Sequence, residues 1–176
     1  MPNSPDGRDI AAVGVATHYV TQTVVVAATT DYTAGDVLSD SASSGTYLKF
    51  SDVVPEKGGS GQIKGAICIS QSTQIAFRPT LLLYHTIPTS NMNDNAADTA
   101  GWTDRAKAVG DISFSSFSTT TGGAKSEVSE GEGGIPKNFK CAHDDNALYG
   151  ILKTEDTETS EVAGHSYIVV LLIQYN

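Results

Sequence analysis

The chain has 176 residues, of which 39% are hydrophobic and 18% are charged, a composition that suits one globular domain and excludes a wholly disordered chain. Its 20 acidic and 11 basic residues leave a formal charge of −9, which argues against a protein that binds nucleic acid by neutralising phosphates. With 18 Ser, 19 Thr and few charges, the sequence indicates short strands joined by polar turns rather than long helices.

The sequence is expected to form an N-terminal arm, residues 1–12, followed by one domain that spans residues 13–176. The first ten residues lack the apolar segment of a secretory signal, and no apolar run approaches the ~20 residues of a membrane span. We therefore expect no membrane partner.

The arm has little to bury, so a frayed terminus and an arm that orders on a neighbouring chain both remain open. Ile10, Val13 and Val15 alternate in part and could add a strand to an exposed sheet edge. Arg8 and Asp9 supply charges of both signs, which favour a fixed register over raw affinity. These five residues are predicted contacts with the capsid or with a neighbouring subunit.

Period-two alternation of apolar side chains predicts strands along the rest of the chain. The expected strands cover residues 13–28, 46–54, 63–69, 74–86, 109–117, 139–143, 147–153 and 165–175. Some eight to ten short strands at this spacing are typical of an antiparallel β-sandwich or barrel, so the fold class is predicted to be all-β.

Three segments interrupt the pattern. Pro79 cannot donate to a ladder, so its strand is expected at a sheet edge or bulged near its middle. Residues 88–108 form the longest connection, with room for one short helical turn after residue 96. Residues 122–134 are rich in Gly and Glu and are expected to form an exposed loop.

The run from Tyr167 to Ile173 is apolar at every position. Such a run predicts a central strand that is covered on both faces, because neither row of side chains suits contact with water.

No residue is predicted to be catalytic or to bind a cofactor. The four histidines, His18, His85, His143 and His165, are widely spread, and the chain has neither a GxSxG elbow nor an HExxH helix. Glycines 58, 59 and 61 lack the Lys-Ser/Thr pair of a phosphate-binding loop and predict a hairpin turn instead.

No metal ligand is predicted either. Asn93–Asn95 and Asp144–Asn146 carry oxygen ligands of the kind that Ca²⁺ takes, but both lack the spacing of an EF-hand and suit turns better. Cys68 and Cys141 lack CxxC spacing and are expected to be free, semi-buried thiols.

Trp102, the lone tryptophan, and Arg105 lie in the long connection and are predicted contact residues. Trp102 could equally plug one end of the core or anchor a contact with another subunit. A carbohydrate-binding role would need an aromatic platform, for which Trp102, Tyr32 and Phe117 are the candidates because most other aromatics fall on expected strands.

Several local patterns resemble, in order, a family of small β-rich virion proteins that decorate or cement the capsids of tailed bacteriophages. They are YTAGDVL, TYLKFSDVVPEKGGSGQIKGAICIS, LLLYHTIPTSNMNDNAA, AVGDISF, ALYGILKT and SYIVVLLIQYN. The order of these motifs, which cover roughly residues 32–175, carries the likeness more than any one of them. The Glu- and Gly-rich segment, residues 122–134, departs from the pattern.

This resemblance implies a jelly-roll-like sandwich of about 8–10 antiparallel strands that stabilises the outer surface of a phage capsid. It further implies contact with the major capsid protein, a trimer, no catalytic residues and no cofactor. Synthesis in the host cytoplasm would precede assembly onto the virion. The alternative is a receptor-binding or carbohydrate-binding module associated with a tail or head fibre.

Overall fold

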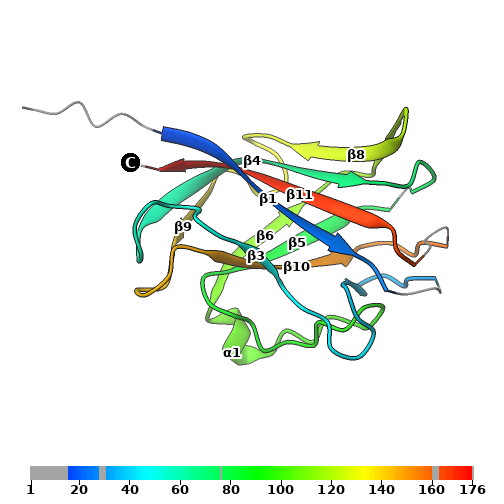
Figure 1. Cartoon of the computed structure of the whole chain (residues 1–176), viewed down its shortest axis with the longest axis horizontal. Coiled ribbons are helices and arrows are strands. Elements are labelled where there is room, and N and C mark those ends of the chain that lie inside the picture. The colour runs from blue at the N-terminus through cyan, green and yellow to red at the C-terminus, as the bar shows by residue number, and fades with distance from the viewer. Residues whose placement is uncertain (1–15, 28–30, 76, 160–162, 176) are drawn as a thin grey trace, which may run out of the picture.

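The computed structural model describes residues 16–27, 31–75, 77–159 and 163–175 (Figure 1). Within these residues, eleven strands and one short helix follow one another along the chain. They are β1 (Ala16–Val25), β2 (Val37–Leu38), β3 (Leu48–Phe50), β4 (Ser60–Ser70), β5 (Pro79–Tyr84), α1 (Trp102–Arg105), β6 (Ala108–Ser113), β7 (Ser118–Thr120), β8 (Gly123–Val128), β9 (Lys137–Lys140), β10 (Leu148–Thr154) and β11 (Ser166–Tyr175).

The strands form two antiparallel sheets. The first sheet has the order β1-β11-β4-β8-β7, with β9 also paired to β4. The second has the order β2-β10-β5-β6, with β3 also paired to β10. Side chains from the inner faces of both sheets meet in one large apolar cluster, which is the packing expected of a sandwich.

The strands pair as in one long hairpin: strands of the first half of the chain pair with strands of the second half in reverse order. β1 pairs with β11, β2 and β3 pair with β10, β4 pairs with β8, and β5 pairs with β6. Successive pairs fall in alternate sheets, so the hairpin is rolled up into the strand order of a jelly roll. The predicted all-β, jelly-roll-like sandwich is confirmed.

β11 lies between β1 and β4, so its predicted place inside a sheet is confirmed. Its side chains alternate: Tyr167, Val169, Leu171 and Ile173 are 0% exposed in the core, whereas the intervening positions 168, 170 and 172 are only half-buried. The prediction that both faces are covered is wrong. An antiparallel sandwich covers the inner face of each sheet and leaves the other to solvent or to a partner.

The second sheet, by contrast, is buried on both faces. Every residue of β5 is buried, and so is nearly all of β10. A second apolar cluster on the outer face of this sheet joins Leu82, Tyr84 and Ile151 to Tyr47 and Met92 from the loops. Figure 1 shows the long connection with α1 on the side of β10 that faces away from β11.

Two sequence-based expectations need correction. Pro79 is the first residue of an interior strand, where its missing N–H is tolerated, and not part of an edge or a mid-strand bulge. The segment 122–134 is not a continuous loop, because β8 occupies Gly123–Val128 and pairs with both β4 and β7. Two of its inward residues, Ala124 and Ser126, are small, so only Val128 marks the inner face in the sequence.

We predict that two adjacent leucines of β11 respond differently to the same substitution. Leu171→Ala should lower the free energy of unfolding by about 2–5 kcal/mol, because it opens a cavity in the core. Leu172→Ala, on the half-buried outer face, should cost less than half as much. Urea unfolding of both variants measures the difference, and equal losses would contradict the register of β11.

Candidate interaction sites

Trp102 is the most exposed large apolar side chain that the structure describes. It begins α1, and 86% of its surface is accessible. Arg105, at the end of the same helix, is also exposed. Trp102 therefore does not plug the core, and its contact with another subunit stays a prediction. The other five predicted contact residues, at positions 8, 9, 10, 13 and 15, lie outside the described residues.

A buried carboxylate fixes the helix that carries Trp102. Asp104 is 1% exposed, and its oxygens accept hydrogen bonds from the Thr89 backbone N–H at 2.9 Å and the Ser90 hydroxyl at 2.6 Å. Lys107 Nζ also donates to Asp104, at 3.1 Å. α1 is thereby tied to the start of the long connection, so Trp102 is presented from a rigid support rather than from a free loop.

Two opposing effects act on the pKa of Asp104. Burial raises the pKa of this carboxyl, but the hydrogen bonds from Ser90, Thr89 and Lys107 to the charged form outweigh burial and hold the pKa well below the usual range. Asp104 therefore stays ionised at neutral pH, and its bonds retain their charge-assisted strength.

Asp94 plays a similar part at the other end of the connection. It is 3% exposed and accepts hydrogen bonds from the Ala27 N–H at 2.9 Å, the Tyr32 hydroxyl at 2.9 Å and the Ser39 N–H at 2.7 Å. The carboxylate in the run Asn93–Asn95 is therefore bonded to donors of the protein itself.

The second oxygen-rich segment is also occupied by protein donors. The hydroxyl of Tyr149 and the Asn146 N–H both donate to Asp145, and the Asn146 side chain donates to Asp52 Oδ1 at 2.8 Å. Within the described residues, no group of three His, Cys, Asp or Glu side chains could hold a metal ion.

The two thiols are buried and free in the structure, as the sequence predicts. Burial raises the pKa of Cys68 far above that of an ordinary thiol, and burial together with the charge of Asp145 raises that of Cys141 to about 11. Both thiols are protonated at neutral pH and so lack the thiolate that nucleophilic chemistry needs.

The expected aromatic platform for a sugar is not formed. Tyr32 is 0% exposed and Phe117 is 7% exposed. Phe117 packs edge-on against Phe77, with ring centroids 5.4 Å apart. Only Trp102 of the three candidates reaches the surface, so the carbohydrate-binding alternative loses the platform that it required.

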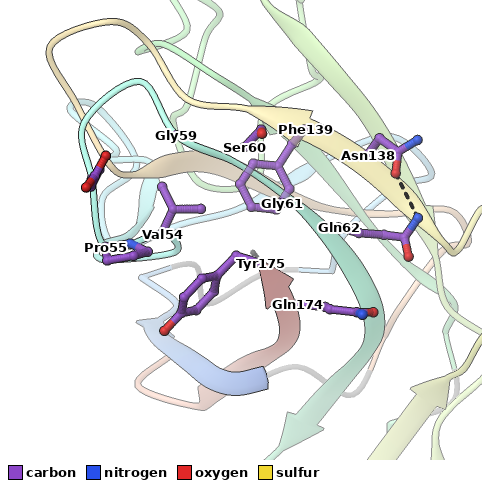
Figure 2. Close-up of a pocket in the computed structure, with 11 residues that line it drawn as sticks. Val54, Pro55, Gly59, Ser60, Gly61, Gln62, Asn138, Phe139, Gln174 and Tyr175 are labelled. Carbon is purple, nitrogen blue, oxygen red and sulfur yellow. Dashed lines mark hydrogen bonds between the residues drawn. The ribbon is translucent and has the colours of Figure 1, made fainter. Parts of the chain in front are cut away.

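A hollow that was not expected from the sequence lies at one end of the sandwich (Figure 2). It has a volume of about 670 Å³ and is lined mainly by the first residues of β4, the last of β11 and part of β9. Tyr175 and Phe139 form its apolar part, and the amides of Gln62, Asn138 and Gln174 form a polar row. Gln62 donates to Asn138 at 2.8 Å.

The lining suits contact with another molecule better than acid–base chemistry. Among the described residues that line this hollow, only Glu56 and Tyr175 are ionisable. Ala16, the first described residue of β1, is the register partner of Tyr175. The N-terminal segment therefore joins the domain beside this hollow.

None of the described helices is long and apolar enough to cross a membrane. No protein-family model matches the chain, and no curated protein matches it.

Two solved virus structures share weak similarity with the chain. One is a full particle of Israeli acute paralysis virus heated to 63 degrees, with 12% identity over 98% of this chain and 73% of the other, at a TM-score of 0.31. The second is a marine algae virus of the order Picornavirales, with 13% identity over 97% of this chain and 73% of the other, at a TM-score of 0.26. TM-scores this low establish no relationship, and the fold assignment above rests on strand order alone.

We predict that Asp104→Asn has an effect on stability that depends on pH. Because the folded pKa lies below the ~3.9 of an unfolded aspartate, Asp104 stabilises the folded state above about pH 4, and this contribution is lost as the pH falls toward the folded pKa. The wild type should therefore be more stable than the variant at pH 6, and the gap should shrink toward pH 2. Thermal unfolding over this range measures it, and a constant gap would contradict the assignment.

Proposed function

We propose that this chain is a structural virion protein that decorates and stabilises the outer surface of a bacteriophage capsid by bridging major capsid protein subunits. The ordered sequence motifs that resemble phage decoration proteins support this proposal. The jelly-roll strand order supports it further, because that fold is common among capsid and lectin domains. The role requires no catalytic residue, only a rigid body with adhesive surfaces.

The observation that carries the proposal is the placement of Trp102. Tryptophan is the residue type most enriched among the energetic anchors of protein interfaces, and here 86% of its surface is left uncovered. The bonds of Asp104 hold its helix in place, so little conformational entropy would be lost when a partner binds.

A bridging protein needs adhesive surfaces on different sides of one body, and this domain offers them. α1 lies at the lower edge in Figure 1, whereas the start of β1 and the end of β11 lie together at the left end. The hollow around Tyr175 is at that end. We place one capsid contact at α1 and a second at the end of the domain where β1 begins.

The charge of the chain favours the outside of the shell. A formal charge of −9 would be repelled by packaged DNA in the interior. We further propose that the chain is made in the host cytoplasm and joins the capsid as a trimer, as the resemblance implies, without a nucleic-acid partner.

The decoration role predicts that Trp102→Ala weakens binding to empty heads of the phage that encodes the chain. The loss should be about 30-fold or more, equivalent to roughly 2 kcal/mol, because an interface anchor is removed. The melting temperature should stay unchanged, since the side chain packs against little of the domain. Co-sedimentation with purified heads measures the affinity. Trp102→Phe, which keeps an aromatic ring, should retain part of it, and full binding by Trp102→Ala would remove the main support for the proposal.

The proposed role of the arm leads to a second prediction, in which head binding changes and the melting temperature does not. Deleting residues 2–11 should reduce co-sedimentation with heads while the melting temperature holds, because strand addition at a partner's edge supplies main-chain hydrogen bonds outside this domain. Binding at the wild-type level would show that the arm is not a fastener.

A further inference from the structure

On the outer face of the first sheet, the described residues leave a band of apolar side chains along β11 and β4 partly exposed, bordered by threonines of β1 and by Lys125 and Glu127 of β8. Ile67 and Ile69 of β4 lie beside the outward row of β11, in register with Val170 and Ile168. Ile69 is 36% exposed, and Tyr19 on the neighbouring strand β1 is 68% exposed. The loops cover the second sheet with a cluster of its own, but the first sheet presents its apolar row to the outside. A contiguous apolar surface of this kind marks an interaction site.

A hollow interrupts this face at Gly65. The glycine is the register partner of Leu172, and the pairing of β4 with β11 shifts immediately beyond Leu172. Without a side chain at this position, a depression of about 120 Å³ opens between Leu172 and Val128. Tyr19 stands at its rim, because it is the register partner of Leu172 on the other side. A protruding aromatic ring and an empty socket are therefore neighbours on one face.

The charges around the socket have both signs. Lys64 pairs with Glu130 at 2.6 Å, and Lys125 approaches Glu127 at 3.4 Å. All four lie on the β4 and β8 side of the face, and surface pairs of this kind stabilise the domain itself only weakly. A nucleic acid or a uniformly charged partner would meet repulsion from one sign or the other. A second copy of the same face can match both.

The size of the face suits a specific contact. β1, β11 and β4 are 10, 10 and 11 residues long, and with β8 they form four neighbouring strands. At ~4.8 Å between strands and ~3.3 Å per residue, the face measures roughly 600 Å². This area is close to what each partner contributes at the lower end of stable protein interfaces.

We propose that a second copy of this chain covers the outer face of the β1-β11-β4-β8 sheet, with Tyr19 of one copy entering the Gly65 socket of the other. The ring would fill a depression that is lined by apolar side chains such as Ile67, Val170 and Leu172 and by the charged Lys64 and Glu127, and the charges at the rim would pair between copies. The inference is independent of the virion role, since it concerns only contacts between copies. Because the ring and the socket are neighbours on one face, the two copies exchange rings across a two-fold axis, so this contact is separate from the interface of the proposed trimer.

Filling the socket tests the proposal without removing any native contact. A Cβ atom at Gly65 would lie 3.5 Å from the Val128 oxygen and 3.7 Å from Leu172 Cβ, which are ordinary contact distances, and its φ is outside the left-handed region. Gly65→Val should therefore fold, with its methyl groups occupying the socket. Tyr19→Ala removes the protruding ring instead, and most of that ring is exposed.

The measurement is the mass of the protein by light scattering at tens of micromolar, with melting temperatures recorded alongside. The wild type should be a dimer, and Gly65→Val and Tyr19→Ala should each raise the dissociation constant at least 30-fold at an unchanged melting temperature. Tyr19→Phe, which keeps the ring, and Gly65→Ala, which fills the socket only partly, serve as matched controls and should lose less.

Two results would overturn the proposal: a monomeric wild type, or an oligomer that neither substitution weakens. Should Gly65→Val lose stability, Tyr19→Ala decides, because its site is on the surface. Head binding is a separate assay, so failure of this interface and failure of the decoration role can be told apart.

Discussion

The alternation of side chains along β11 is the constraint on which the rest of the structure depends. β11 is paired on both sides, with β1 and with β4. Its inner row, which includes Val169 and Leu171 at 0% exposure, holds the first sheet on the core. Because successive side chains point to opposite faces, this register also fixes an outer apolar row that the described residues leave half-buried. The same pairing that builds the core therefore creates the adhesive face.

The outer faces of the two sheets differ in how far the rest of the chain covers them. The second sheet is covered by the long connection, which two buried carboxylates hold in place: Asp94 bonds to the loops before and after β2, and Asp104 bonds to Thr89 and Ser90. The same bonds leave Trp102 on the outside of a fixed helix. The first sheet has no such cover among the described residues. The outer face of the first sheet is therefore available for contacts within an assembly.

Much of the fold could be predicted from the sequence, because strand periodicity is a local property. β1, with Val20 and Val24 inward, and β11 were found in this way. β8 was missed because two of its three alternating inward residues, Ala124 and Ser126, are small and glycines flank the strand, so the alternation was hidden. The roles of Asp104 and of the Gly65 socket depend on contacts between distant segments, which no local pattern reveals. For Trp102 the sequence left open a plug at one end of the core or a contact with another subunit. Its exposure in the structure excludes the plug.

The most direct test of the account is quantitative mass spectrometry of purified, intact virions of the phage that encodes the chain. A capsid-decorating protein should be present in a fixed molar ratio to the major shell protein, and should remain with empty heads from which the DNA has been released. Finding the chain in the lysate of infected cells but not in purified particles would contradict the account.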